Sequence, residues 1–177
     1  MQAFNPYLPS WEYIPDGEPH IFDSRLYIDG SHDRFRGHVF CLNDYVCWSA
    51  PVDDLSDWRY EGVIYKKTDD PDNPFGRACL YAPDVTRGPD GRFYLYYVLD
   101  KENTVAVAVC DQPAGKYKFY GHVFCLNDYV CWSAPVDNLA DWRYEGVIYK
   151  KTDDPDNREG KACLYAPDVT QAPYGRY

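Results

Sequence analysis

The chain lacks both an excess of positive charge and a long apolar run. Its formal net charge is −10 and its pI is about 4.7, whereas nucleic acids and anionic lipid surfaces are bound through basic patches. No run approaches the roughly 20 apolar residues of a transmembrane helix. Residues 1–6 have neither the basic nor the apolar region of a signal peptide. We therefore expect a cytoplasmic protein with neither nucleic acid nor membrane as a partner.

Cysteine pairs of the metal-binding kind are also missing. The seven cysteines are an odd number, none stands in a CxxC pair, and their spacing suggests no zinc site. Several lie in apolar, strand-like runs, such as Cys110 at the end of residues 104–110. The sequence therefore predicts buried, reduced thiols, with no metal and no other cofactor.

Signals for helices are nearly absent, and the chain predicts an all-β fold. Its 14 prolines and 12 glycines interrupt the sequence about every eight to twelve residues, which is the spacing of strands and turns. The clearest predicted strands are residues 25–30, 38–50, 58–66, 79–86, 92–100, 104–110 and 116–120.

Aromatic residues are abundant, with 18 tyrosines and 5 tryptophans. Their apolar faces and polar edges suit the binding of sugar rings, but the same side chains also fill the space between β-sheets. Because strands favour aromatic residues in any case, the composition alone does not decide between the two.

A near-identical internal repeat is the most unusual feature of the sequence. Residues 37–86 recur as residues 121–170, and only five of these 50 positions differ between the copies. Structural repeats ordinarily diverge much further, because each copy has only to preserve its core pattern. The near-identity indicates a recent duplication, a designed one or a splice in the gene, and the sequence does not choose among these.

The order of the predicted strands indicates β-propeller-like blades of four antiparallel strands. Residues 18–66 would form one blade and 81–120 another, and the second copy would add strands at 122–134, 142–150 and 163–170 and one from Gly175. Propellers close with four to eight blades, so about three blades' worth of strands predicts an incomplete ring.

We expect one propeller-type domain over residues 1–177. Residues 1–36 would begin the first blade, and 37–120 would supply its remainder and the second blade. Residues 121–177 are a truncated repeat of 37–93.

Several motifs together resemble glycoside hydrolase family 43, in its β-xylosidase/α-L-arabinofuranosidase branch. The first-blade motifs are Asn5-Pro-Tyr-Leu, Asp16-Gly-Glu-Pro-His-Ile-Phe and Leu26-Tyr-Ile-Asp-Gly-Ser-His-Asp. The second blade shows Tyr81-Ala-Pro-Asp-Val-Thr and Gly91-Arg-Phe-Tyr-Leu-Tyr-Tyr. The resemblance is continuous over residues 5–120, and residues 121–177 share it only as a copy of 37–93.

This resemblance implies a five-bladed propeller with its active site at the axis, and an inverting hydrolase of arabinosyl or xylosyl bonds. Such enzymes use a general base, an acidic residue that tunes the acid, and a general acid. The base deprotonates water on one face of the sugar while the acid protonates the leaving oxygen on the other, with the two carboxyl groups roughly 6.5–9.5 Å apart.

Two of these catalytic roles map onto the chain. The family's base precedes a proline, which places it at Glu18, with Asp16 as a competitor because Glu18 is one methylene longer than the family's Asp. The tuning acid maps to Asp84, and Asp168 is its duplicate. The alternative is that Glu18 and Asp16 belong to a polar turn and that Asp84 merely ends a strand.

Ser31, His32 and Asp33 end a predicted strand and are candidates for binding the substrate at the same mouth. A lone histidine in such a place is more often a hydrogen-bonded structural residue, so both interpretations of His32 stay open.

The general acid of the family lies in the third blade, where this chain instead has the second copy. No Glu within residues 121–177 has the sequence context of the acid. General acid–base assistance contributes about 10²–10⁴-fold, so we expect weak or no activity on arabino- or xylo-oligosaccharides. The alternative is a non-catalytic propeller fragment that completes its fold by self-association as a homo-oligomer.

Overall fold

The computed structural model describes residues 7–100, 104–125, 129–133 and 143–150, together with 135, 152, 153, 155 and 158. These residues form ten strands and one short 3₁₀ turn, η1 (Lys67–Asp69). The chain divides into two compact units, residues 1–125 and 126–177, and each is described by itself. The predicted all-β architecture is confirmed.

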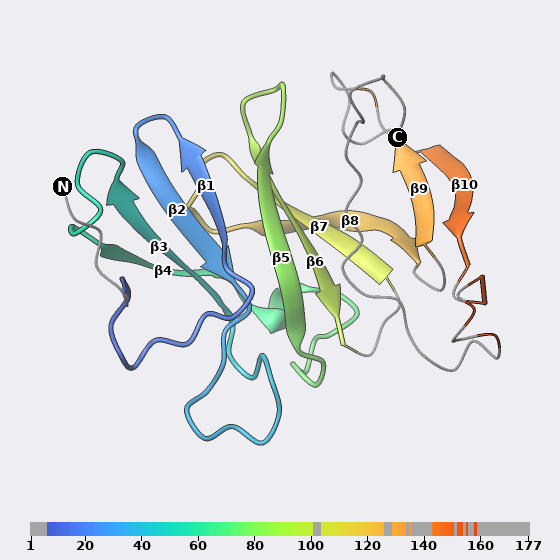
Figure 1. Cartoon of the computed structure of the whole chain (residues 1–177), viewed down its shortest axis with the longest axis horizontal. Helices are drawn as coiled ribbons and strands as arrows, with labels where there is room; N and C mark the ends of the chain where they lie inside the picture. The colour runs from blue at the N-terminus through green and yellow to red at the C-terminus, as the bar shows by residue number, and fades with distance from the viewer. Residues whose placement is uncertain are drawn as a thin grey trace. The chain divides into compact units, whose positions relative to one another are not determined.

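The first unit contains an antiparallel sheet whose strands follow chain order. It consists of β1 (Glu18–Phe22), β2 (Arg25–Gly30), β3 (Tyr45–Pro51) and β4 (Arg59–Tyr65) (Figure 1). A two-residue turn joins β1 to β2, and its first residue, Asp23, has a φ of 55°, a conformation that Asp tolerates better than most residues.

A second four-stranded antiparallel sheet follows directly. It consists of β5 (Leu80–Arg87), β6 (Phe93–Leu99), β7 (Thr104–Cys110) and β8 (Lys118–Cys125), again in chain order (Figure 1). The turn between β5 and β6 is closed by Gly91 with a φ of 83°, which glycine adopts without steric cost. The predicted blades of four antiparallel strands are therefore confirmed.

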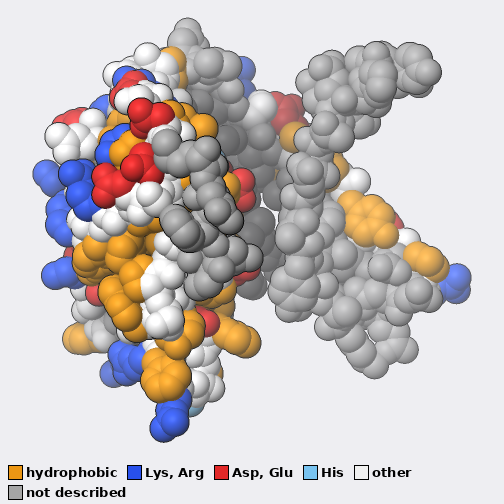
Figure 2. Space-filling view, turned by 60° about the vertical axis from the view of Figure 1, so that its left-hand side comes forward, with side chains coloured by type: hydrophobic (Ala, Val, Ile, Leu, Met, Phe, Trp, Pro, Cys, Tyr) orange, Lys and Arg blue, Asp and Glu red, His pale blue; other side chains and the backbone are white. Residues whose placement is uncertain are grey.

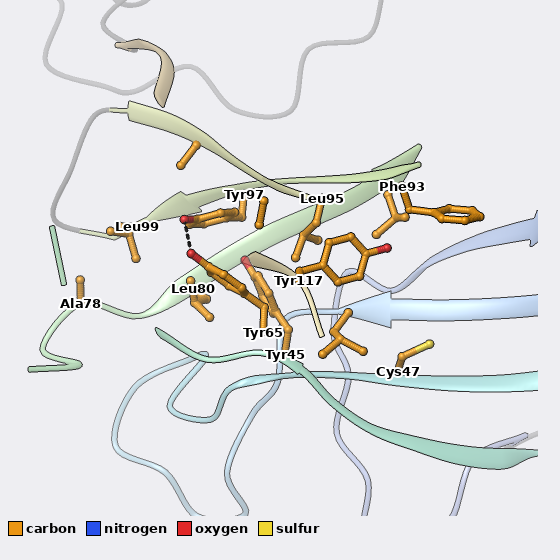
Figure 3. Packing of buried hydrophobic residues seen from close by; sticks show 14 residues of the cluster. Tyr45, Cys47, Tyr65, Ala78, Leu80, Phe93, Leu95, Tyr97, Leu99 and Tyr117 are labelled. Carbon is orange, nitrogen blue, oxygen red and sulfur yellow. Dashed lines mark hydrogen bonds between the residues drawn. The ribbon is translucent and has the colours of Figure 1, made fainter. Parts of the chain in front are cut away.

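The hydrophobic core lies between the two sheets. Tyr45 and Tyr65 from the first sheet meet Leu80, Leu95 and Tyr97 from the second (Figure 3). The hydroxyl oxygens of Tyr65 and Tyr97 lie 2.7 Å apart. A buried phenol needs a hydrogen-bond partner, so this pair satisfies polar groups inside an otherwise apolar interface.

The Tyr97 hydroxyl also donates to Oδ2 of Asp70 at 2.5 Å. Asp70 is fully buried in the loop between β4 and β5. The hydrogen bond therefore ties this loop to the core between the two sheets.

Three predicted strands have wrong boundaries, and all of them lie where a copy of the repeat begins. The predicted strand 38–50 starts only at Tyr45, and residues 37–41 form an irregular loop instead. The identical residues 121–125 continue β8 and pair with β7, so the predicted strand 116–120 is longer than expected. Of the predicted strand 122–134, residues 122–125 belong to β8 and residues 129–133 to β9.

The second unit contains one described hairpin, β9 (Tyr129–Ser133) and β10 (Arg143–Tyr149). Its register repeats that of β3 and β4: Ser133 pairs with Arg143 as Ser49 pairs with Arg59. The Ser133 hydroxyl donates to Oε1 of Glu145 at 2.5 Å, as in the first copy. The predicted strands at 163–170 and from Gly175, and the predicted site residue Asp168, lie outside the described residues.

The described surface carries charges of both signs between apolar patches (Figure 2). Within the described residues, no helix is long and apolar enough to cross a membrane. The free cysteines include Cys41, Cys47, Cys79, Cys110 and Cys131.

Candidate active site

The first strands of the two sheets lie side by side. β1 and β5 are edge strands of their sheets, and β5 contacts both β1 and β2 (Figure 1). Residues on β1 and β5 that are far apart in sequence are therefore neighbours in space. The carboxyl groups of Glu18 and Asp84 are carried by these two strands.

A hydrogen bond between His20 and Asp84 connects the two strands. His20 Nε2 lies 2.8 Å from Oδ1 of Asp84, and the Asp84 side chain remains 58% exposed. His20 was not predicted as a site residue. It could have been found from its spacing, because it stands two residues after Glu18 on the same strand and so shares its face.

The position of Asp84 depends on a β-bulge at the start of β5. Tyr81 pairs with Val98 and Asp84 with Tyr96, so β5 has one residue more than its partner strand there. Ala82 within this bulge has a φ of 41°, which is uncommon for a residue other than glycine. Bulges of this kind redirect side chains, and this one sets the direction of Asp84.

Ser31 and Tyr45 hold the bulge from the first sheet. The Ser31 hydroxyl is fully buried and accepts a hydrogen bond of 2.9 Å from the Ala82 backbone N–H. The Tyr45 hydroxyl donates to the Tyr81 carbonyl oxygen at 2.9 Å. The structure thus places Ser31, a predicted substrate-binding residue, as a link between the two sheets.

Glu18 and Asp16, the two candidates for the base, are both exposed. Glu18 is the first residue of β1 and pairs across the strands with Asp29. Asp16 lies in the preceding turn with a φ of 58°. The structure thus places Glu18 on the strand that carries His20 and Asp16 two residues before it.

His32 and Asp33 are hydrogen-bonded within the protein. Nε2 of His32 lies 2.8 Å from Oε1 of Glu12, and Nδ1 lies 2.9 Å from the carbonyl oxygen of Asp44. Asp33 accepts a hydrogen bond of 2.7 Å from the backbone N–H of Cys41. These partners favour the structural interpretation of His32.

Asp29 is a further acidic residue at this site that the sequence did not single out. It is 2% exposed, and no N–H or O–H group among the described residues donates to its carboxyl oxygens. Burial is the main cause that raises the pKa of Asp29 to about 7. The signal was an acid that follows the apolar run Leu26-Tyr-Ile within a strand.

Among the described residues, Asp70, Asp72 and His122 are grouped closely enough to hold a cation, and no such set was predicted. His122 Nε2 lies 3.3 Å from Oδ2 of Asp72. The oxygens of Asp70 already accept hydrogen bonds from the Tyr97 hydroxyl and the Asp72 backbone N–H. The contacts that Asp70, Asp72 and His122 make within the protein therefore account for their close grouping.

A groove of about 670 Å³ lies elsewhere on the first unit. His32, a predicted substrate-binding residue, is among its lining residues with Asn43 and Tyr60, whereas Glu18, His20 and Asp84 are not. The groove therefore does not coincide with the cluster at β1 and β5.

No protein-family model matches the chain. Over 122 residues it is 80% identical to a xylosidase/arabinosidase of Thermoclostridium stercorarium. The matched region covers 69% of this chain and 26% of that relative. Over 116 residues it is 34% identical to xylosidase/arabinosidase 43A of Humicola insolens, covering 59% of this chain and 34% of that relative. The chain thus spans about a quarter to a third of the length of these relatives.

A crystal structure of a GH43_1 enzyme from Xanthomonas citri has the same arrangement of strands. The TM-score is 0.53 at 25% sequence identity, over 70% of this chain and 38% of the other. The four-stranded sheets of this protein are therefore propeller blades, and the chain belongs to glycoside hydrolase family 43.

Proposed function

We propose that this chain carries the first two blades of a glycoside hydrolase site that acts on arabinosyl or xylosyl bonds. The single observation that carries the proposal is the His20–Asp84 hydrogen bond, which connects β1, the strand of Glu18, to β5, the strand of Asp84. The names of the related xylosidase/arabinosidases support the choice of sugar.

In this proposal Glu18 is the general base, with Asp16 as its competitor. The base removes a proton from the water that attacks the anomeric carbon in an inverting reaction. The exposure of Glu18 at the start of β1 leaves its carboxylate accessible to water. Asp16 is equally exposed, so the two carboxylates must be separated by substitution.

Asp84 tunes the site from the second blade. His20 is its partner, and the bulge at Ala82 sets its direction. Ser31, His32 and Asp33 are proposed to shape the wall of the substrate site through the hydrogen bonds that they make within the protein. Asp168 would reproduce the role of Asp84 in the second copy.

No Glu within residues 121–177 has the sequence context of the family's acid, so in a site built from these residues alone the leaving oxygen would depart unprotonated. A nitrophenol leaves readily as an anion, whereas a sugar does not. We therefore expect slow hydrolysis of nitrophenyl arabinosides or xylosides and little or none of natural oligosaccharides. The substrate would be an arabino- or xylo-oligosaccharide, bound without a cofactor.

The test is release of nitrophenol by the intact chain and by four variants, one of them a control. Glu18→Gln or Asp16→Asn, whichever carries the base, should abolish release, and Asp84→Asn should also abolish it. Asp57→Asn, at an exposed residue of the β3–β4 connection, is the matched control and should leave the rate unchanged. Equal rates in all these proteins would overturn the assignment.

A second candidate is a non-catalytic fragment that completes its fold by self-association. The observation that favours it is the β9–β10 hairpin, which keeps the register of β3–β4 while Val147, Ile148 and Tyr149 are exposed. Light scattering on the intact chain tests this candidate. A folded monomer at micromolar concentration would exclude it.

A further inference from the structure

A buried carboxyl group that receives no N–H or O–H hydrogen bond lies next to the proposed site. Asp29 is 2% exposed, and no N–H or O–H group among the described residues donates to its carboxyl oxygens, so that the Cys47 thiol is its one close polar neighbour there. Leaving a buried polar group unpaired costs about 1–3 kcal/mol, and burying an unpaired charge costs more. The neighbouring residues of Asp29 must therefore explain why this costly burial is tolerated.

The strand register brings Asp29 to the acidic cluster. Asp29 pairs with Glu18 on one side and with Cys47 on the other. Directly opposite residues in antiparallel strands present their side chains on the same face, about 4.5–5.5 Å apart at Cβ. His20 is the diagonal neighbour on that face, since it pairs with Tyr27 two residues earlier on β2.

Titratable groups face Asp29 from four segments of the first unit. They are Glu18 and His20 on β1, Cys47 on β3, Asp84 on β5 and Tyr117 after β7. Burial is the largest cause of the raised pKa of Asp29. Cys47 and His20 act in the opposite direction, and Asp84 adds to the rise.

His20 therefore has two carboxyl groups of unlike character in its surroundings. Asp84 is exposed and holds the imidazole by a hydrogen bond of 2.8 Å. Asp29 is enclosed, and an enclosed carboxyl group favours its neutral form. While Asp29 is neutral, Asp84 is the stronger attraction for His20.

We propose that Asp29, kept neutral by its burial, is a positioning residue that leaves His20 bonded to Asp84, and that its ionisation draws the imidazole away. The consequence for catalysis rests on the proposed function, because Asp84 is the residue that His20 orients. The electrostatic coupling of Asp29 and His20 does not depend on it.

The experiment follows the four histidines of the intact chain by NMR as the pH is raised. His20 is identified by its loss in His20→Gln, and the exposed His38 is the internal control. In Asp29→Asn we expect the His20 curve to lie at lower pH than in the parent chain, because the variant cannot supply the second negative charge. We expect His38 to be unchanged.

Superimposable His20 curves in the parent chain and in a folded Asp29→Asn variant would overturn the proposal. If the variant does not fold, the shape of the His20 curve in the parent chain tests the proposal. A His20 curve in two steps, with one step matching titration of the Asp29 carboxyl carbon, supports coupling. A single step with the midpoint of His38 overturns it.

The nitrophenol assay distinguishes a failure of the role of Asp29 from a failure of the proposed function. Loss of coupling with normal nitrophenol release would reject the role of Asp29 alone. Coupling without any release would reject the proposed function and leave the pairing of Asp29 with His20 intact. If both hold, the pH profile of release should change in Asp29→Asn and not in the control Asp57→Asn.

Discussion

His20 and Asp84 are 64 positions apart in sequence, and their side chains meet at 2.8 Å between two blades. We expect His20→Gln to reduce nitrophenol release about tenfold, less than the 10²–10⁴-fold of a group that transfers the proton itself. The free energy of unfolding should change by less than about 1 kcal/mol, because the pair is partly exposed. His38→Gln is the control, and an equal loss in both variants would contradict the role of His20.

The two copies of the repeat provide a matched pair of core substitutions. Ile64 is 1% exposed, whereas its duplicate Ile148 is 56% exposed. Ile64→Ala should lower the free energy of unfolding by about 2–5 kcal/mol, and Ile148→Ala should change it by less than about 0.5 kcal/mol. Urea unfolding of the two variants measures both. Similar losses would mean that the second hairpin is as well packed as the first.

Ser31→Ala removes the buried acceptor of the Ala82 backbone N–H. A buried donor left unpaired costs about 1–3 kcal/mol, and we expect a loss of that size in urea unfolding. Ser56→Ala is the control, because Ser56 is exposed and the second copy already has Ala140 there. A Ser31→Ala variant as stable as Ser56→Ala would contradict the stabilising role of this hydrogen bond.

The pH dependence of stability should reveal Asp29. Its pKa is about 7 in the folded protein against an ordinary value of 3.8, so the folded state binds more protons between these values. The contribution of Asp29 to the free energy of unfolding therefore falls as pH rises from about 4 to about 7, by roughly 4 kcal/mol in total.

Urea midpoints at pH 5 and pH 8 measure this contribution. In Asp29→Asn the difference between the two midpoints should shrink, because the side chain no longer titrates. An unchanged difference in the variant would show that Asp29 ionises in the folded protein as it does in the unfolded chain.

Strand order and blade architecture could be predicted because they rest on local patterns. The predicted strand at 25–30 is β2, and that at 104–110 is β7. The cluster at β1 and β5 was only partly accessible. Asp84 and Glu18 came from motifs, but His20 gains its meaning from a partner 64 residues away, and Asp29 from being enclosed.

The sequence by itself determined the pairing of the repeated hairpin. Its two copies differ at only two positions between the first and last strand residues, 54/138 and 56/140, and they adopt the same register. Gly62 and Gly146 both have positive φ values, 102° and 126°, at the same bulge. Cross-strand neighbours are close in sequence, so the hairpin carries the information for its own pairing.

Only the tertiary structure decided the conformation where the two copies begin. Residues 37–41 and 121–125 have the same sequence, yet the first form an irregular loop and the second extend β8. The first are held in their loop by the Asp33 carboxylate, which accepts a hydrogen bond from the Cys41 backbone. The second continue a strand that already lies against β7. A five-residue segment takes the backbone hydrogen bonds that its surroundings offer, and these surroundings are set by the fold.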